Sequence, residues 1–371
     1  MTLPFRQFVL KLHGRCNLAC DHCYVYEMAD QRWRTRPRAM APEIAERTAE
    51  RIGEHARTWG LASVDVVLHG GEPLLAGEAA IRHVVGAVRD RVPARVSVQT
   101  NGTLLDQRFA DLFTELGIRV SVSVDGDEQA HDRHRVRPDG TGSFAGVRRG
   151  VDLLRGRSCY GGLLCTVDLR NDPVHTYEAL LGLAPPMIDF LLPHGNWSAP
   201  PPGRTADAGR APYGEWLAAA FDRWYSAPRR ETGVRIFEEL ITVLFGGAST
   251  VEGIGLSPAL MVVVETDGTI EQSDILASAF EGAGSTGLDV RTASFDEVLA
   301  LPEIRARQAG AAGLSATCQE CRLHRVCGGG LRAHRYREGE GFDHPSVYCP
   351  DLKHLIRHVR ARLTRDLAAI R

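Results

Sequence analysis

The chain has 371 residues, of which 44% are apolar and 24% are charged, and its net charge is -2. This is enough apolar material to bury one large core and a smaller one, so we expect two domains. The basic residues are spread along the chain and no apolar stretch is long enough to cross a bilayer, which argues against nucleic-acid and membrane partners. We expect the partner to be a small molecule or a polypeptide.

The chain contains nine cysteines, an odd number. Its N-terminal residues lack the charged and apolar segments of an export signal, so we expect a cytoplasmic protein. Because the cytoplasm keeps thiols reduced, cysteines that occur in groups predict metal ligands rather than disulfides.

Short apolar runs alternate with helical patterns along the first half of the chain. This alternation predicts parallel strands joined by crossover helices. Six such units would form a partial (β/α)6 barrel of the TIM type, whose functional residues collect on the loops after the carboxyl ends of the strands. The apolar runs occupy residues 7–12, 63–68, 95–99, 118–124, 161–168 and 187–192.

A proline-rich stretch near residue 200 interrupts this alternation. Helical patterns follow at 213–225, 234–245 and 351–370, and alternating residues around a Thr-Asp-Gly turn predict a β-hairpin at 261–272. We therefore expect an α/β chain with a partial barrel at 1–200, a helical linker at 201–250 and a small cysteine-rich domain at 251–371.

Cys16, Cys20 and Cys23 stand at a C-x3-C-x2-C spacing directly after the first apolar run. Three thiolates on one loop can hold three corners of a cubane iron-sulfur cluster and leave the fourth iron open to another ligand. A structural zinc site fits this loop poorly, because zinc takes four donors, usually from paired C-x2-C units.

Polar and glycine residues follow the next predicted strands. The second strand is followed by His-Gly-Gly-Glu-Pro at 69–73, where two glycines let the backbone close on a ligand. Gln99 ends the third strand, Ser123 ends the fourth, and Arg135 follows with a guanidinium suited to a carboxylate. Each residue alone is more often a helix cap or a turn residue, so the prediction rests on their shared rim.

A second group of cysteines lies near the C-terminus. Cys318, Cys321 and Cys327 follow a C-x2-C-x5-C spacing, and Cys349 adds a fourth thiolate. Four thiolates complete either one iron-sulfur cluster or one zinc site, and the spacing does not separate the two. The remaining pair, at positions 159 and 165, matches no ligand spacing, and we assign neither to a cluster.

The three-cysteine loop, the GGEP segment and the later SVDG segment, in this order, resemble the radical S-adenosylmethionine (SAM) superfamily. The resemblance implies a [4Fe-4S] cluster whose open iron binds SAM, and a 5'-deoxyadenosyl radical that abstracts hydrogen from the substrate. It assigns Gly70, Gly71 and Glu72 to the amino group of SAM, Ser123 and Arg135 to its carboxylate, and Gln99 to cofactor binding, while His22 is placed to flank the adenine.

The C-terminal cysteines resemble the SPASM extension of radical SAM peptide maturases. Ser273 and Leu331 stand where that family has two cysteines of its first auxiliary cluster, and no cysteine occurs in the window before Gly268. The second ligand set is intact. We therefore expect two [4Fe-4S] clusters, one that binds SAM and one auxiliary cluster that is fully ligated by protein.

Two acidic residues are candidates for the catalytic base. Asp274 follows the vacated cysteine position, where sulfatase-maturing relatives place a catalytic aspartate. Glu265 is a weaker candidate on the same hairpin. The alternative is that Asp274 is a hairpin aspartate that faces water.

Several stretches of the chain resemble the SPASM subgroup that matures FxSxx-type precursor peptides and forms cyclophanes. The implied enzyme is an oxidoreductase that takes hydrogen from a side-chain β-carbon of a ribosomally made precursor peptide and joins that carbon to an aromatic ring. Its electrons would come from a reductant such as flavodoxin or ferredoxin. Thioether formation, epimerisation, formylglycine-type oxidation and a non-catalytic iron-sulfur redox sensor remain as alternatives.

Overall fold

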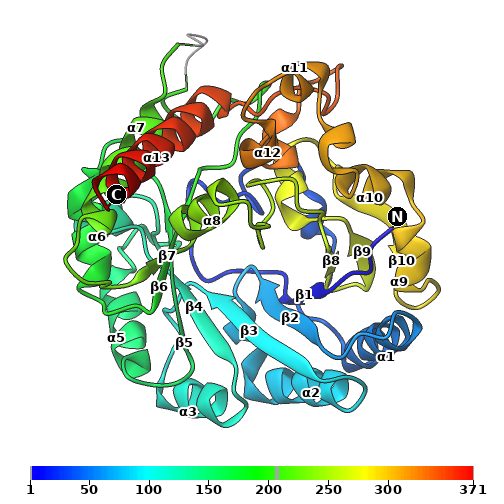
Figure 1. Cartoon of the computed structure of the whole chain (residues 1–371). Helices are drawn as coiled ribbons and strands as arrows, with labels where there is room; N and C mark the ends of the chain where they lie inside the picture. The colour runs from blue at the N-terminus through cyan, green and yellow to red at the C-terminus, as the bar shows by residue number, and fades with distance from the viewer. Residues whose placement is uncertain (1, 205–208, 371) are drawn as a thin grey trace. The chain divides into compact units, whose positions relative to one another are not determined.

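Five parallel strands built from the predicted apolar runs form the centre of the first part of the chain (Figure 1). The computed structural model describes residues 2–204 and 209–370. These form two compact units, of which the first comprises residues 1–124, 128–164 and 260–306. The strands are β1 (Gln7–His13), β2 (Val64–Gly70), β3 (Ala94–Thr100), β4 (Arg119–Ser123) and β5 (Tyr160–Thr166).

Helices connect these strands in the order that the sequence predicts. Their apolar residues recur every three or four positions, so each helix buries one face and exposes the other. Start signals are also present, such as the Asp106 side chain, which accepts a hydrogen bond from the Phe109 amide. The helices are α1 (Pro42–Thr58), α2 (Gly77–Arg89), α3 (Gln107–Glu115), α4 (Glu128–Asp132) and α5 (Phe144–Leu154).

The predicted hairpin is confirmed, and it joins the same sheet as the barrel strands. Strands β8 (Met261–Val264) and β9 (Thr269–Glu271) pair antiparallel, and β10 (Ser285–Asp289) pairs with β9. β8 also runs parallel to β1, so β1 lies between β2 on one side and β8 on the other. The hairpin therefore belongs to the first unit, together with α9 (Phe295–Leu299) and most of α10 (Pro302–Arg307).

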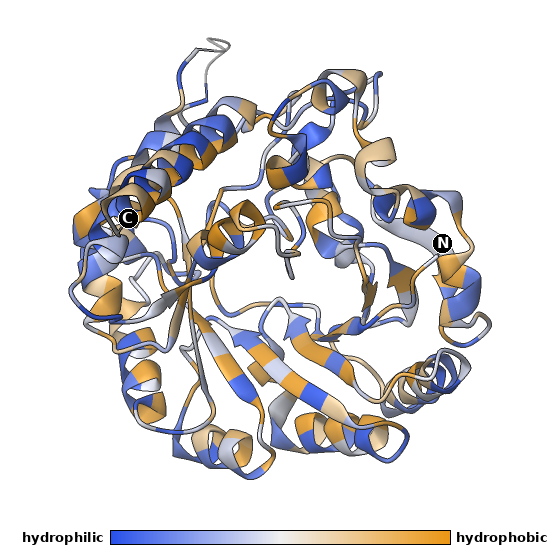
Figure 2. Ribbon diagram, in the orientation of Figure 1, coloured by the Kyte–Doolittle hydropathy of each residue, from blue (hydrophilic) through white to orange (hydrophobic). Residues whose placement is uncertain are grey.

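Strand β1 is buried along most of its length. Phe8 and Leu10 are fully buried, and the ring of Phe8 packs 4.9 Å from that of Phe295. In the hydropathy colouring, apolar residues alternate with polar ones along strands such as β3 and β4 (Figure 2). On β2, Val64, Val66 and Leu68 are buried. The alternate residues of this strand, which include His69, are only partly buried. This period of two decides which side chains reach the site.

The second unit contains the rest of the described chain. Its two strands, β6 (Met187–Leu191) and β7 (Gly233–Val234), pair in parallel, and helix α13 packs on α7. Among the described residues, we find no helix with the length and apolar character needed to span a membrane. The helices are α6 (Pro173–Leu181), α7 (Pro212–Tyr225), α8 (Arg235–Leu244), α11 (Ala316–Gln319), α12 (His324–Cys327) and α13 (Cys349–Ile370).

The α/β fold class and the cysteine-rich C-terminal region are as predicted from the sequence. All six predicted strands are present, with ends within three residues of the expected ones, and so are the helices expected at 213–225, 234–245 and 351–370. The domain boundaries expected near residues 200 and 250 stay a prediction.

Candidate active site

The three-cysteine loop and the Gly-Gly turn are bound to each other through their backbones. The amide of Gly71 donates to the carbonyl of His13 at 2.8 Å, and the amide of Glu72 donates to the carbonyl of Arg15 at 3.0 Å. A Cβ on Gly71 would lie 1.7 Å from the Tyr26 hydroxyl, and one on Gly70 would lie 2.3 Å from the His13 carbonyl oxygen. Both glycines are therefore required for the ends of β1 and β2 to approach this closely.

The thiols of this loop are surrounded by hydrogen-bond donors. The Cys16 sulfur accepts from the Leu18 amide at 3.4 Å and from the Asn101 side-chain amide at 3.5 Å. Burial raises the pKa of Cys16 to about 11, and burial also raises the pKa of Cys23. These thiols are therefore protonated at neutral pH, and a metal must displace their protons when it binds.

Neither group of cysteines is arranged as tightly as the ligands of a formed zinc site. Four sulfurs at about 2.3 Å from zinc would lie about 3.8 Å from one another. Across residues 2–204 and 209–370, no three cysteine sulfurs lie mutually within 4.8 Å.

The C-terminal cysteines converge around a turn of three glycines. Cys327 ends α12, and Gly328, Gly329 and Gly330 follow with φ values of 63°, 75° and 68°. Burial raises the pKa of Cys327 to about 11, and the nearby thiols of Cys349 and Cys318 contribute to the increase. The Gly329 amide donates a hydrogen bond to the Cys327 sulfur, which opposes it. The left-handed backbone lets the chain turn sharply around the thiol.

An apolar side chain occupies one position of the missing ligand set. Leu331 packs against Gly253, where a Cβ would lie 3.0 Å from the leucine side chain. Gly253 itself lies in the segment before Gly268 where the SPASM pattern has a cysteine and this chain has none. This packing agrees with an auxiliary site formed by the second set alone: Cys318, Cys321, Cys327 and Cys349. The two remaining cysteines, Cys159 and Cys165, are buried.

Glu72 is fully buried and bound by its own chain. Its carboxylate accepts from the Leu74 amide at 3.0 Å, the Thr100 hydroxyl at 2.8 Å and the Asn101 amide at 2.8 Å. Burial raises the pKa of Glu72 to about 7. The carboxylate therefore fixes the Gly-Gly turn to the end of β3. Its role toward an amino group of SAM stays a prediction.

The other predicted SAM contacts lie around the same loop. The His22 ring meets the His134 ring edge to face at 5.2 Å, and Asp21 lies 2.7 Å from the His134 Nδ1. Arg135 lies close enough to Cys23 to lower the pKa of that thiol against the effect of burial. Ser123 is buried at the end of β4. The assigned roles of His22, Ser123 and Arg135 stay predictions.

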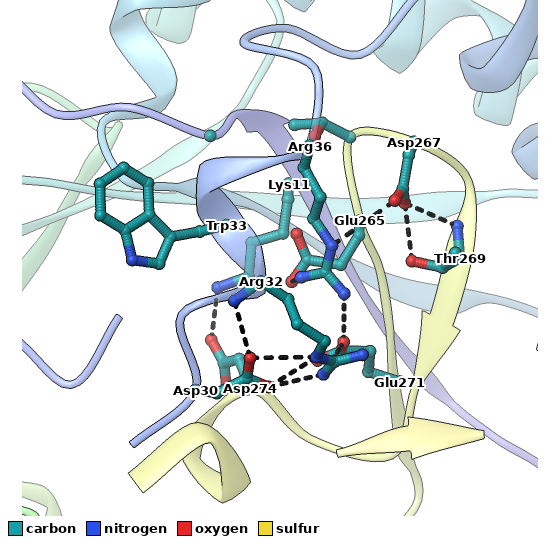
Figure 3. Close-up of polar contacts among 12 residues, drawn as sticks. Lys11, Asp30, Arg32, Trp33, Arg36, Glu265, Asp267, Thr269, Glu271 and Asp274 are labelled. Atoms are coloured by element: carbon teal, nitrogen blue, oxygen red, sulfur yellow. Dashed lines mark hydrogen bonds and ion pairs between the residues drawn. The ribbon is translucent and has the colours of Figure 1, made fainter. Parts of the chain in front are cut away.

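A cavity opens beside the cysteine loop, within the first unit. Gly14 and Arg15 line it from the loop, the turn contributes both of its glycines, and Glu265 and Asp274 line it from the hairpin and the segment after it. Figure 3 shows the charged side chains of several lining residues, among them Lys11, Arg36, Glu265 and Asp274. The cavity thus brings together segments more than 200 residues apart in the sequence.

Asp274 is held in this cavity by an ammonium and a phenol. Its Oδ2 lies 2.7 Å from the Lys11 Nζ (Figure 3). The same oxygen accepts a hydrogen bond from the Tyr24 hydroxyl at 2.7 Å. Burial alone would raise the pKa of Asp274, but Lys11 and these hydrogen bonds hold it well below its usual range. The side chain is only 13% exposed, so the alternative of an aspartate facing water is wrong.

Lys11 also binds His69, its cross-strand neighbour on β2. The Lys11 ammonium lies 3.0 Å from His69 Nδ1, which must accept the bond, so the ring is neutral and carries its proton on Nε2. Gln99 bonds the same ring, and burial, followed by the charge of Lys11, lowers the pKa of His69 to about 4. Asp274, Lys11, His69 and Gln99 form one polar chain across three strands.

Glu265 lies on the other side of the cavity against Arg36, whose Nη1 is 3.2 Å from its carboxylate. Burial raises the pKa of Glu265 to about 7, although Lys11 and Arg36 oppose the change. Arg36 also pairs with Glu271 at the end of the hairpin strand β9 (Figure 3). Glu265 therefore titrates near neutral pH, as a group that exchanges protons does.

Sequence reasoning missed Lys11, Tyr24 and His69. One signal was available for Lys11, which is one of only two lysines and interrupts an apolar strand. His69 directly precedes the glycine pair, but the motif indicates no role for it. Tyr24 directly follows a cysteine ligand and gave no separate signal.

The segment 194–197, which follows β6, makes contacts within the second unit. The His194 Nδ1 lies 3.3 Å from the His334 Nε2, and the Trp197 indole donates to the Pro345 carbonyl at 2.7 Å. These bonds tie the loop after β6 to the cysteine-rich segment.

Comparison with known proteins gives a family match that includes the cysteine loop and the Gly-Gly turn. Residues 10–181 match the model of the Radical SAM superfamily. The serine-type anaerobic sulfatase-maturating enzyme of Klebsiella aerogenes is 26% identical over 339 residues, covering 90% of this chain and 80% of the relative. A cysteine-type anaerobic sulfatase-maturating enzyme of Clostridium perfringens (strain 13 / Type A) is 22% identical over 378 residues, covering 97% of each chain.

Solved structures share the fold. Native anSMEcpe with bound AdoMet matches with a TM-score of 0.81 at 22% identity, covering 97% of this chain and 98% of that one. SuiB of Streptococcus suis, bound to the precursor peptide SuiA, matches with a TM-score of 0.59 at 14% identity, covering 94% and 76%. The matched segment carries the cysteine loop and the Gly-Gly turn, so this part of the chain is similar to the Radical SAM superfamily. Its fold follows that of the anSMEcpe structure along nearly the whole chain.

We predict that Gly71→Ala prevents assembly of the loop that holds the first cluster. The new methyl group would overlap the Tyr26 hydroxyl and the Arg15 carbonyl, so the turn and the loop must separate. Iron and sulfide content after anaerobic reconstitution, and 5'-deoxyadenosine formed from SAM and dithionite, should both fall. The matched control is Gly86→Ala in α2, where a Cβ meets nothing within 4 Å. Wild-type values in Gly71→Ala would contradict the proposed contact.

We also predict a pH-dependent stability that depends on His69. The folded ring stays neutral to about pH 4, whereas an unfolded histidine titrates near 6.5. Between these values the unfolded state binds more protons, so stability falls as the pH falls. Between pH 7 and 5, the wild type should lose about 2 kcal/mol more unfolding free energy than His69→Gln, measured by urea unfolding. His83→Gln, at a half-exposed site, should behave as the wild type; equal pH slopes in all three proteins would refute the buried neutral ring.

Proposed function

We propose that this protein is a radical SAM maturase that oxidises a side chain of a peptide. The observation that carries the proposal is the position of Asp274, which lines a cavity formed by the cysteine loop, the Gly-Gly turn and the hairpin. Support also comes from the relatives, which are named sulfatase-maturating enzymes, and from SuiB, which was solved with a precursor peptide. We expect such a peptide to enter this cavity.

The residues present fit the cofactors that the proposal requires. Cys16, Cys20 and Cys23 would hold the first [4Fe-4S] cluster, and the C-terminal four would hold the auxiliary one. When bound, the first cluster and SAM supply a 5'-deoxyadenosyl radical, which removes a hydrogen atom from the substrate. We further propose that Gly70, Gly71, Glu72, Gln99, Ser123, Arg135 and His22 surround SAM.

Within the cavity, Asp274 is the proposed proton acceptor. Its pKa is held well below the usual range by Lys11, so it accepts protons only from strong acids. The substrate becomes a strong acid once its carbon radical has lost an electron, whether it is then a protonated aldehyde or a protonated ring. Lys11 and Tyr24 keep the carboxylate ionised and oriented for that step. Glu265 is the second candidate, because its pKa of about 7 suits it to pass the proton onward.

Two products follow from this chemistry, and each has its own support. A cyclophane, in which a side-chain β-carbon is joined to an aromatic ring, is favoured by the missing first auxiliary ligand set, a feature of the cyclophane-forming subgroup. Formylglycine is favoured by the sulfatase-maturating relatives and by an aspartate in the position that Asp274 occupies. We propose the cyclophane and retain formylglycine as the second candidate. We also propose flavodoxin or ferredoxin as the reductant, and a cytoplasmic location.

The product can be identified by co-expressing this protein with the short peptide encoded beside its gene and analysing that peptide by tandem mass spectrometry. A cyclophane lowers the mass by two hydrogens and suppresses backbone fragments inside the ring. Formylglycine from serine lowers the mass equally, but it reacts with a hydrazide probe and fragments normally. We predict that Cys20→Ala abolishes the product and that Cys165→Ser, at a buried non-ligand cysteine, retains it.

Product from Cys20→Ala would contradict the cluster assignment. An unmodified peptide, together with no 5'-deoxyadenosine from SAM and dithionite, would favour an iron-sulfur sensor over an enzyme. An unmodified peptide with normal 5'-deoxyadenosine would mean that the wrong peptide was supplied, so peptides carrying a serine, a cysteine or an aromatic residue would be tested next.

The role of Asp274 can be separated from the formation of the radical. Loss of a general base costs about 10²- to 10⁴-fold in rate, so Asp274→Asn should lower product formation by at least about 100-fold. Its 5'-deoxyadenosine yield should stay near that of the wild type, because the radical forms without this residue. Glu265→Gln should have a smaller effect, and Glu281→Gln, on the exposed surface, should have none. Undiminished product from Asp274→Asn would exclude it as the base.

A further inference from the structure

The C-terminal cysteines of the second unit lie among basic side chains that the proposed function does not use. We call this group the basic shell; it consists of Arg307, Arg332, Arg335 and Lys353. Each member interacts either with a cysteine ligand or with another member of the shell, through a hydrogen bond or through electrostatic attraction or repulsion.

Arg335 is fixed beneath the turn that follows Cys327. Its Nε donates to the Gly329 carbonyl at 3.0 Å, and its Nη2 donates to the carbonyls of Gly328 and Gly330, both at 2.7 Å. Burial lowers the pKa of Arg335, and the nearby thiols of Cys318 and Cys327 oppose that change. Because three carbonyls hold the guanidinium, its charge stays beside the sulfurs.

Lys353 approaches the ligand set from helix α13. It lies four residues after Cys349, on the same face of the helix, and its side chain hydrogen-bonds to the Cys349 sulfur. The chain has only two lysines, and the other is Lys11 in the active-site cavity. A hydrogen bond to a ligating sulfur stabilises negative charge on that sulfur.

The remaining members extend the positive charge beyond the ligands. Burial lowers the pKa of Arg332, and repulsion from Arg307 and Arg335 lowers it further. Glu252 offsets part of this charge through an ion pair with Arg307 at 2.8 Å. Burying such cations is costly unless anionic groups lie beside them.

A cluster held by four thiolates is such a group, and its negative charge increases when it is reduced. Neighbouring cations and hydrogen bonds to sulfur therefore favour the reduced form, which raises the reduction potential. A zinc ion on the same thiolates would also be anionic, but it has no reduced form to stabilise.

We infer that the basic shell raises the reduction potential of the auxiliary cluster so that it accepts the surplus electron of the substrate. The inference rests on the proposed function for the origin of that electron. The substrate loses one hydrogen atom to the 5'-deoxyadenosyl radical, and its carbon radical then loses one electron and one proton. The auxiliary cluster would accept the one electron, and the Asp274 carboxylate in the cavity would accept the proton. A one-electron carrier protein would then reoxidise the cluster.

The test measures the potential without any peptide substrate. The background is the full chain with Cys16, Cys20 and Cys23 replaced by alanine, so that an electron paramagnetic resonance signal arises from the auxiliary cluster alone. In this background we compare Lys353→Met, which removes the charge, with Lys353→Arg, which keeps it. The matched control is Arg357→Met, which removes a charge from an exposed position one turn further along α13.

At the midpoint potential of the parent protein, Lys353→Met should lower the ratio of reduced to oxidised cluster by about tenfold, which corresponds to a shift of about 59 mV for a one-electron couple. Lys353→Arg and Arg357→Met should keep the parent ratio. An unchanged ratio in Lys353→Met at full iron content would overturn the inference, as would zinc in place of iron.

Arg332→Met changes a member of the basic shell whose charge acts on other members, so it should give a smaller fall in the ratio. This variant replaces Lys353→Met in the test if Lys353→Met fails to load iron. None of these outcomes depends on the identity of the peptide product.

Discussion

The candidate active site depends on the position of strand β1 between β2 and β8. Backbone pairing on one side brings the Gly-Gly turn against the loop that follows β1, and pairing on the other side brings the hairpin and Asp274 to the same end. Lys11 on β1 then reaches both neighbours, His69 on β2 and Asp274 beyond the hairpin. One strand thus connects the cysteine loop, which we propose to hold the first cluster, with the carboxylate that would receive the proton.

Much of this arrangement could be predicted from the sequence, because the signals were local. Short apolar runs between helical patterns placed the strands within a few residues, and the cysteine spacings marked both ligand groups. The pairing of β8 with β1 was not predictable in this way, because 250 residues separate the two strands and no local pattern marks the contact. The roles of Lys11 and Tyr24 were missed for the same reason, since each depends on Asp274.

Asp274 illustrates why an isolated residue was ambiguous. A polar residue after a hairpin strand ordinarily faces water, and only the tertiary structure shows that this one is buried against an ammonium and a phenol. Glu72 illustrates the opposite case. The motif suggested a ligand contact, whereas the structure binds its carboxylate to three donors of the same chain.

The attachment of the hairpin has an evolutionary consequence. β8 and β9 join the sheet through backbone hydrogen bonds, which any residue except proline can make. Substitutions at hairpin positions that line the cavity, such as Glu265, therefore leave this pairing intact, whereas Val262, Val263 and Val264 are held by burial in the core. A change at such a lining position can alter what the cavity accepts while β8 stays paired with β1.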